Sequence, residues 1–505
     1  MSSSTQSHRN LPATALAAVC AALLLALPSG AGAASSARVS LSGGITPAFN
    51  PAVLDYVTTC VNNHADLSVT APSGFRAKID KRPARTGTQT AGVSVRPGQR
   101  IELALVKGSK STSYSIRCLP QDFPNFASTG RLPAGSPYMT FAQLRPLPRA
   151  YMVVVDSRGT PVWWLKTGIN SDVKPLGHGT IGSWSGGPID SSAQAGVGHF
   201  IVYSLAGKAL HSVTTGTDTQ DNHETLPSSN GEWYVDNYIL RDHVDLSAFG
   251  MSADANVYDG VIRRVSATGQ TLWSWSSKDH IGLAETGVWW NVLKEPWKVF
   301  GGFVTDVPAD LVHLNSIADD GKGGLIVSFR HLSAIYRIIK ATGQIDWKLG
   351  GTPTSKSLTV LGDNANSPHM VGQHDARVLP DGTITAFDNG WPVYENGITT
   401  GHPPRAVRWK INPAARTATL VEQVTDPEVP TGNCCGNARR LADGTWVIHW
   451  GVPFTRAYGP APAHKVLFAL HMTDGVSYSY RSVPIAPTQM TRSQIMAGMD
   501  AQFPR

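Results

Sequence analysis

The sequence predicts an all-β protein, a six-bladed β-propeller preceded by a small β-sandwich. Its 505 residues include 49 Gly, 34 Pro and 14 Trp but only 16% charged residues, a mixture typical of turn-rich β-proteins. Pairs of hairpin signals recur about every 65 residues, and such a period is typical of propellers. No segment carries a 3.6-residue period long enough to predict a major helix.

The first element in chain order is a predicted secretory signal peptide, residues 1–34. Arg9 precedes an apolar run from Ala13 to Pro28, and small residues follow as in a cleavage site. The run is too short for a confident membrane-spanning helix, and no later stretch is apolar enough to cross a bilayer. We therefore expect a secreted or extracytoplasmic protein, with no integral membrane span after the signal is removed.

Residues 37–120 predict the small β-sandwich, because short alternating apolar runs are separated there by Gly, Pro and Asn clusters. The stretch that begins at Leu41 resembles the opening of cadherin-like domains. In an exported protein the four cysteines that follow the signal suggest disulfides, with three possible connectivities, and a bond between Cys60 and Cys118 would join the two ends of this module. The adjacent Cys434 and Cys435 are compatible with a vicinal disulfide or with two free thiols. Residues 121–150 are expected to be a linker.

Residues 151–490 predict the propeller. Six outer hairpins, each with two apolar strands, alternate with five inner hairpins marked by Gly or by Asn-Gly and Asp-Gly pairs. The last outer hairpin is expected over residues 465–480. Two hairpins make a four-stranded blade, and the missing inner hairpin is expected if the last blade takes a strand from the start of the chain.

Three histidines occupy one repeated position in this pattern. His223, His313 and His374 each stand seven residues before an Asn-Gly or Asp-Gly turn, on the strand expected to line the central channel. Equivalent positions in successive blades face one axis, so the three imidazoles are expected to converge. Arg330 ends the strand that returns from the second of these turns and should lie beside His313. Its planar guanidinium suits a sulfuryl, phosphoryl or carboxylate group.

Several motifs together resemble the bacterial arylsulfotransferases, most closely the branch common in actinobacteria and fungi. They are Asn222–Glu224, Leu311–Ser316, Ser328–His331, Thr342–Gly351, Gln373–Arg377 and Phe387–Gly390. The resemblance covers residues 150–455 in order. It implies a six-bladed propeller that moves a sulfuryl group from a phenolic sulfate ester to a phenolic acceptor by a ping-pong mechanism. The transfer would pass through a sulfated histidine, without a nucleotide sulfate donor.

The resemblance also implies roles for individual residues. His374 matches the nucleophile, and His223, His313 and Arg330 match its transition-state partners. Asn315 and His331 are expected to contact substrate, and no cofactor or metal is expected. Asp375 and Asn315, which neighbour the key histidines in sequence, are candidates to fix an imidazole tautomer.

Two other functions remain open from the residues alone. Three neutral histidines in a channel are a possible ligand set for zinc, iron or copper, although Arg330 disfavours a cation there. A non-catalytic propeller that binds envelope polysaccharide or another protein is the second. Nucleic acid is not expected as a partner, because the net charge of +7 includes no Lys/Arg run. The aromatic insertion from Trp289 to Phe303 is expected to cap the channel or to pack between blades.

Overall fold

The computed structural model describes residues 37–143, 150–186, 198–216, 219–294, 308–363, 369–391, 394–395, 398–399, 401–432, 434–451, 454–474 and 479–505. The predicted signal peptide lies outside these residues. Within them, no helix has both the length and the apolar character needed to cross a membrane.

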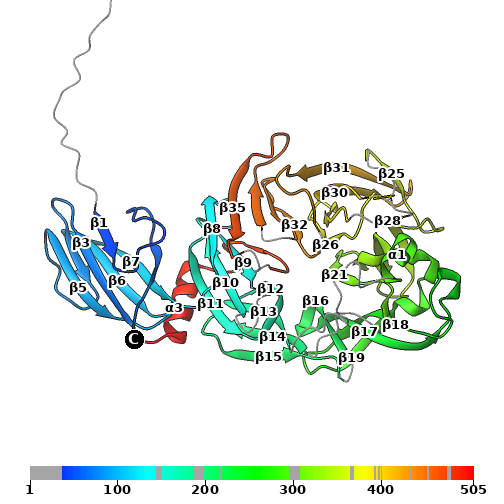
Figure 1. Ribbon diagram of the computed structural model, residues 1–505, viewed down its shortest axis with the longest axis horizontal. Helices are drawn as coiled ribbons and strands as arrows, with labels where there is room; N and C mark the ends of the chain where they lie inside the picture. Colours follow the sequence, from blue (N-terminus) through cyan, green and yellow to red (C-terminus); the bar gives the residue numbers. More distant parts are fainter. Residues whose placement is uncertain are drawn as a thin grey trace, which may run out of the picture.

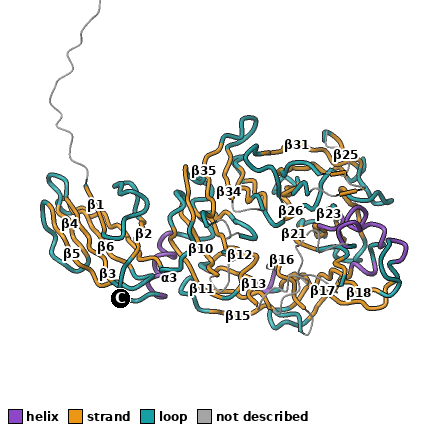
Figure 2. Tube along the Cα trace, viewed as in Figure 1, coloured by secondary structure: helices purple, strands orange, loops and turns teal. Residues whose placement is uncertain are grey.

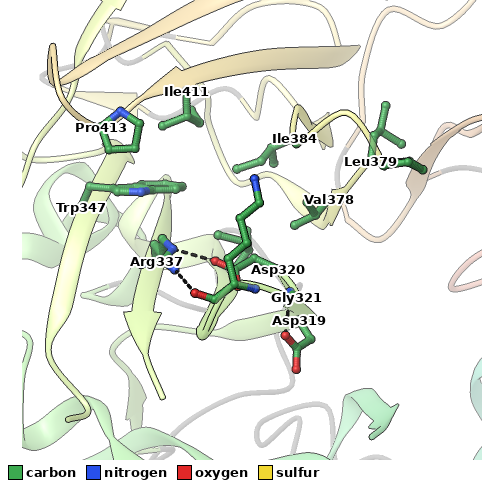
Figure 3. Close-up of a pocket in the computed structure, with 14 residues that line it drawn as sticks. Asp319, Asp320, Gly321, Arg337, Trp347, Val378, Leu379, Ile384, Ile411 and Pro413 are labelled. Atoms are coloured by element: carbon green, nitrogen blue, oxygen red, sulfur yellow. Dashed lines mark hydrogen bonds and ion pairs between the residues drawn. The ribbon is translucent and has the colours of Figure 1, made fainter. Parts of the chain in front are cut away.

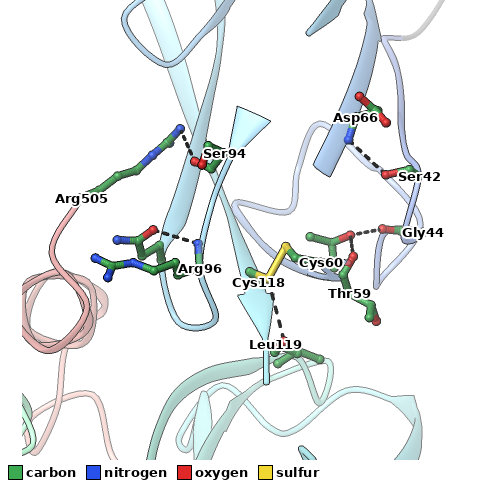
Figure 4. Close-up of a disulfide and its surroundings, with 12 residues drawn as sticks. Ser42, Gly44, Thr59, Cys60, Asp66, Ser94, Arg96, Cys118, Leu119 and Arg505 are labelled. Carbon is green, nitrogen blue, oxygen red and sulfur yellow. Dashed lines mark hydrogen bonds between the residues drawn. A yellow bond between two sulfur atoms is a disulfide. The ribbon is translucent and has the colours of Figure 1, made fainter. Parts of the chain in front are cut away.

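The N-terminal module, residues 37–119, consists of two sheets with one shared hydrophobic core. One sheet has the order β1 (Arg38–Leu41), β3 (His64–Thr70), β5 (Thr88–Ser94). The other has the order β2 (Asp55–Thr59), β7 (Lys110–Leu119), β6 (Arg100–Lys107), β4 (Arg76–Ile79). The alternating burial along β3 reflects the side-chain period of a strand with one face in the core. A disulfide joins Cys60 to Cys118, as expected (Figure 4).

The rest of the described chain confirms the all-β propeller prediction (Figure 1). Six sheets follow one another around a common centre, and the strands of each are named in order from the innermost outward. The first is β36 (Pro484–Ile485), β9 (Tyr138–Ala142), β10 (Ala150–Asp156), β11 (Pro161–Thr167). The second is β12 (Ile169–Gly177), β13 (Thr180–Gly186), β14 (Gly198–Ser204), β15 (Ala209–Val213). The third is β16 (Thr219–Pro227), β17 (Trp233–Val244), β18 (Ala255–Val265), β19 (Thr271–Ser276), with β20 (Ala309–Asp310) parallel to β18.

The fourth sheet is β21 (Leu314–Asp319), β22 (Gly324–Phe329), β23 (Ala334–Ile339), β24 (Ile345–Gly350). The fifth is β26 (His374–Val378), β27 (Ile384–Asp388), β30 (Arg405–Asn412), β31 (Thr417–Thr425), β25 (Thr359–Leu361). The sixth is β32 (Asn437–Arg440), β33 (Trp446–His449), β34 (Phe454–Tyr458), β35 (Val466–Met472), β8 (Phe126–Gly130). A small separate pair is β28 (Tyr394–Glu395) and β29 (Ile398–Thr399).

The ring is closed twice. The early strand β8 pairs with β35 and adds a fifth strand to the outside of the sixth sheet, which therefore takes a strand from near the chain start, but the sheet without its own inner hairpin is the first and not the last. The late strand β36 pairs with β9 and completes the inside of the first sheet. The last outer hairpin was predicted wrongly: it joins β34 to β35, and Asp474 follows β35 instead of forming its turn. Val466, the first residue of β35, pairs with Tyr458, the last residue of β34, so the hairpin turn lies between these two residues.

Among the described residues, helical structure is confined to short segments and one terminal helix (Figure 2). The short segments are η1 (Ser229–Gly231), η2 (Ser247–Phe249), η3 (Ser277–Asp279), η4 (Leu283–Trp289), α1 (Trp290–Leu293) and η5 (Arg330–Leu332). Helix α3 (Arg492–Gln502) is capped by Thr491 and lies between the N-terminal module and the first sheet. Asp500 on α3 pairs with Arg117 of the module at 2.7 Å, so the chain end ties the two parts together.

Candidate functional site

The three predicted histidines converge. His223 lies on β16, His313 immediately precedes β21, and His374 is the first residue of β26. The ring centroids of His223 and His313 are 4.7 Å apart, and those of His313 and His374 are 6.4 Å apart. All three side chains are buried. The repeated register therefore brings together side chains that are separated by up to 151 residues in sequence.

Each of these rings is held by its Nδ1 atom. Nδ1 of His223 lies 2.7 Å from Asp221 Oδ2, and Nδ1 of His313 lies 2.7 Å from Asp310 Oδ2. Nδ1 of His374 instead lies 2.7 Å from Asn389 Oδ1 and 3.0 Å from the carbonyl oxygen of Gly372. Among the described residues, no protein group hydrogen-bonds the Nε2 atom of any of the three.

The tautomer of His374 follows from its partners. Both groups facing its Nδ1 are acceptors, provided that Asn389 presents its oxygen there. Asn389 does so because its Nδ2 donates to the carbonyl oxygens of Gly432, at 2.9 Å, and Cys435, at 3.2 Å. The Nδ1 atom of His374 therefore carries the proton, and its Nε2 atom carries a free lone pair.

Arg330 lies beside His313, as predicted. Its backbone N–H donates to the carbonyl oxygen of His313 at 2.9 Å. Its guanidinium carbon lies over two neighbouring indoles, 4.5 Å from the ring centroid of Trp289 and 5.0 Å from that of Trp391, whose centroids are 6.5 Å apart. The indole faces attract the cation and favour this position of the guanidinium. Burial lowers the pKa of Arg330 to about 10, which leaves it charged at neutral pH.

His331 supports this arginine. Its Nδ1 donates to the carbonyl oxygen of Asp310 at 2.7 Å, so its Nε2 accepts from Arg330 Nη1 at 2.9 Å. Both ring nitrogens are thus occupied by protein groups. The aromatic insertion reaches the site in the same place, because Trp289 at the end of η4 stacks on Arg330 and its Nε1 donates to Ser333 Oγ at 2.9 Å. The part of this insertion over residues 295–307 lies outside the described residues.

The histidines are kept neutral by their surroundings. Burial, followed by the charge of Arg481, lowers the pKa of His223 to about 3. Burial also lowers the pKa of His313 and His374 well below the usual range, and the charge of Arg330 acts in the same direction. Each ring is therefore uncharged at pH 7, the state in which a histidine nitrogen can act as a nucleophile or a base.

A pair of carboxyl groups stands behind His223. Oxygen atoms of Asp221 and Asp236 lie within 4.8 Å of each other and of a His223 ring nitrogen. Burial, followed by the neighbouring carboxylates, raises the pKa of both acids well above the usual range. Two buried carboxyl groups this close together cannot both ionise readily, so they share one proton.

A network of charged groups connects the innermost strands of several sheets, including β12, β16 and β26. Arg481 is fully buried and donates to Asp172 Oδ1 at 2.6 Å, Glu224 Oε2 at 3.2 Å and the carbonyl oxygen of Asn315 at 2.6 Å. Asp375 accepts from Arg377 at 2.7 Å. Further ion pairs join Lys174 to Glu224 and to Asp172, Arg377 to Glu224, and Arg439 to Asp375. Burial alone would raise the pKa of Glu224, but the neighbouring cations hold it well below its usual range.

Sequence reasoning did not identify the residues that orient the rings. It proposed Asp375 and Asn315 for that task, but Asp375 pairs with arginines of the charged network. Asn315 donates from its amide nitrogen to the carbonyl oxygen of Gln373 at 2.8 Å. The buried amide oxygen of Asn315 has no hydrogen-bond partner among the described residues. Tyr480 was also missed. Its ring meets those of His223 and His374 edge-on, at centroid distances of 5.4 Å and 6.4 Å.

Two groups in the described residues have the composition of metal ligands. They are Asp310 with His313 and His331, and Asp221 with His223 and Asp236. Neither contains the three convergent histidines that the sequence suggested as a ligand set. In the first group, His331 already receives a hydrogen bond from the cationic Arg330, an arrangement that opposes a metal cation.

A surface pocket lined by described residues lies away from the histidines. It has a volume of about 450 Å³, and its lining includes Trp347, Ile384 and Ile411, with Asp319 and Arg337 at its edge (Figure 3). Asp319 ends β21, whereas His313 precedes the first residue of that strand, so the pocket and the histidines lie at opposite ends of it. This pocket contains none of the predicted site residues.

The fold and the site together define a β-propeller with a buried cluster of neutral histidines around one arginine. The chain belongs to the arylsulfotransferase (ASST) family, whose family model matches residues 190–453, just over half of the chain. That range includes all four residues predicted to carry the chemistry. Membership of the family supports aryl sulfotransferase activity in general.

The other comparisons give distant similarities only. A search of curated proteins finds no match. A catalytically inactive virginiamycin B lyase from Staphylococcus aureus with quinupristin is 8% identical, with a TM-score of 0.31 over 71% of this chain and 89% of that one. A chain of the nidogen/laminin complex is 10% identical, with a TM-score of 0.35 over 68% of this chain and 97% of that one. The Cps50 (Swd1) β-propeller domain of Myceliophteria thermophila is 9% identical, with a TM-score of 0.32 over 69% of this chain and 98% of that one. No functional conclusion follows at this level of similarity.

Proposed function

We propose that this protein is an exported aryl sulfotransferase that moves a sulfuryl group from a phenolic sulfate ester to a phenolic acceptor. His374 is the nucleophile, and the reaction is a ping-pong cycle without a nucleotide sulfate donor. The observation that carries the proposal is the hydrogen bonding of His374, whose Nδ1 faces two acceptors, so that its Nε2 carries the lone pair; the His313 ring lies 6.4 Å away between centroids.

In the first half-reaction, Nε2 of His374 attacks the sulfur of the donor. The bond between sulfur and the phenolic oxygen breaks, and the donor leaves as a phenolate. Arg330 neutralises the charge on the sulfuryl oxygens, and its stacked guanidinium requires little reorganisation during the step. His331 holds Arg330 through its Nε2, so we assign it a supporting role instead of direct substrate contact.

In the second half-reaction, a phenolic acceptor attacks the sulfur of the sulfated His374. Its proton passes to Nε2 of His313 or His223, and the bond between sulfur and the His374 nitrogen breaks. The carboxyl partners of these two histidines, Asp310 and Asp221, stabilise the imidazolium that forms. The histidine then releases that proton to solvent, where it balances the phenolate that left in the first half-reaction, so the cycle leaves the enzyme unchanged. Substrate contact by Asn315 remains part of the proposal, through its unpartnered amide oxygen.

The test is an assay of the purified mature protein with p-nitrophenyl sulfate and phenol, with and without a chelator. Nitrophenol release should require phenol, resist the chelator and fall at least about a hundredfold in His374→Ala, because the nucleophile is lost. The exposed His211→Ala is the matched control and should behave as wild type. With donor alone, wild type but not His374→Ala should gain the mass of one sulfuryl group. Full activity in His374→Ala would refute the proposal, and loss of activity with the chelator would favour a metalloenzyme.

A further inference from the structure

The adjacent cysteines lie next to the site. Cys434 and Cys435 form a vicinal disulfide in the loop between β31 and β32. The carbonyl oxygen of Cys435 accepts a hydrogen bond from Asn389 Nδ2 at 3.2 Å, and Asn389 Oδ1 in turn accepts one from His374 Nδ1 at 2.7 Å. Two hydrogen bonds therefore connect the disulfide loop to the ring of the proposed nucleophile.

The same loop supports a second neighbour of His374. The backbone N–H of Gly436 donates to the carbonyl oxygen of Tyr480 at 2.9 Å, and the Tyr480 ring lies edge-on to His374. Gly432 supplies the second carbonyl that Asn389 Nδ2 contacts. The loop thus fixes the orientation of the Asn389 amide and the backbone position of Tyr480.

The loop is held in a conformation that an unrestrained chain rarely adopts. Cys435 has a φ of 63°, in the left-handed region that non-glycine residues seldom occupy. The loop is tightly packed at the two glycines beside the disulfide. A Cβ on Gly436 would lie 2.5 Å from a Phe387 ring atom, and one on Gly451 would lie 2.0 Å from the Cys434 carbonyl oxygen. The small ring closed by neighbouring cysteines restrains the backbone torsions of both residues, so breaking it frees Cys435 to leave this conformation.

We infer that the Cys434–Cys435 disulfide is a positioning element for His374, which acts through Asn389 to keep the Nε2 lone pair directed into the site. Asn389 is a positioning residue, since it contacts the ring nitrogen that does not react. The inference deepens the proposed function and rests on it for the catalytic consequence, but its structural part, the tautomer of His374, stands separately.

Reduction by dithiothreitol supplies the perturbation. The reductant gives two electrons and two protons, the bond between the two Sγ atoms breaks to two thiols, and the reductant closes to its own cyclic disulfide. Cys60–Cys118 is reduced as well, so Cys60→Ser/Cys118→Ser is the matched variant that retains only the vicinal disulfide. Cys434→Ser/Cys435→Ser is the variant that lacks it.

The first readout is the pre-steady-state release of nitrophenol from the donor. We expect dithiothreitol to slow this step about tenfold in wild type and in Cys60→Ser/Cys118→Ser, the effect of one lost hydrogen bond. Cys434→Ser/Cys435→Ser should be slow from the start and insensitive to the reductant. Asn389→Ala should be slowed to a similar degree, mainly in kcat, since the substrate contacts are intact. Asn389→Asp keeps an oxygen towards His374, but its second oxygen faces the two carbonyl oxygens that Nδ2 contacts in wild type. Its rate should therefore lie between those of Asn389→Ala and wild type.

The second readout is independent of activity. In protein labelled with 15N histidine, the His374 signals, assigned by their loss in His374→Ala, should report a single Nδ1–H tautomer in wild type. Asn389→Ala and the reduced protein should give a mixture of tautomers. An unchanged tautomer in both, or a reductant effect that persists in Cys434→Ser/Cys435→Ser, would overturn the inference. If wild type shows no sulfuryl transfer but the tautomer shifts as expected, the proposed function fails while the positioning role stands.

Discussion

Arg481 offers the sharpest test of how the channel is held together. It comes from the segment before β36, yet it bonds to Asp172 on β12, Glu224 on β16 and the backbone of Asn315 on β21. Its side chain has no exposed surface. Arg481→Met fills much of the same volume without the charge, so the variant removes the hydrogen bonds with little loss of packing.

The expected loss of stability depends on the cations that each carboxylate keeps in this variant. Asp172 and Glu224 keep Lys174, and Asp375 keeps Arg377 and Arg439. Because no acid is left without a cation, we expect the lower end of the cost of breaking a buried pair, about 3 kcal/mol. With an unfolding entropy of about 2.1 cal/mol/K per residue over the roughly 340 residues of the propeller, the melting temperature should fall by about 4 °C.

The assay is thermal unfolding followed by near-ultraviolet circular dichroism at one scan rate. Arg416→Met is the matched control, since Arg416 is exposed and bonds only to carbonyl oxygens of surface loops. Its melting temperature should stay within about 1 °C of wild type. If Arg481→Met also stays within that margin, the network does not stabilise the channel and the reasoning is wrong. Arg481→Lys, which keeps the charge but not the planar fork, should fall between the two.

Two further predictions concern the site. Arg330→Lys should lower kcat/KM about a hundredfold, because an ammonium group presents no planar set of donors and cannot lie over Trp289 and Trp391 as the guanidinium does. Activity close to wild type in steady-state assays would contradict this. The pKa of His223 is about 3 in the folded protein, below the value of about 6.5 in the unfolded chain. As pH falls, the unfolded chain therefore takes up a proton first, and the contribution of the neutral His223 to stability is lost between pH 6.5 and 3. At pH 5 the loss of unfolding free energy due to His223 is about 2 kcal/mol. Urea unfolding at pH 7 and pH 5 should therefore show a smaller loss of stability in His223→Gln than in wild type. Equal losses would mean that His223 is charged in the folded state.

The sequence was informative where the fold repeats. The inner strand of each blade runs into its turn with one register, so a fixed offset from the turn was sufficient to predict that His223, His313 and His374 meet. The place of Arg330 followed from the strand that returns from the same turn. These residues depend on local hairpin geometry, which the turn residues specify strongly.

The partners of these residues follow no such register. Asp221 stands two residues before its histidine, Asp310 three before, and Asn389 fifteen after. Tyr480 and Arg481 enter the channel from the segment that closes the ring, so their places depend on how the chain ends meet. Trp289 and Trp391 reach Arg330 from connections outside the sheets. Contacts of this kind are set by tertiary packing, which leaves no periodic signal in the sequence.

The same difference between partners separates three histidines that the sequence treats as equivalent. A carboxyl group on Nδ1, as at His223 and His313, stabilises the charge that appears when Nε2 takes up a proton. The amide of Asn389 and the carbonyl of Gly372 fix the tautomer of His374 but carry no charge to offset a second proton. His374 is therefore the ring best suited to remain neutral and attack sulfur, while the other two are suited to exchange protons with the phenols. Asp310 and Asp221 thus support the proposed division of roles as much as the histidines themselves do.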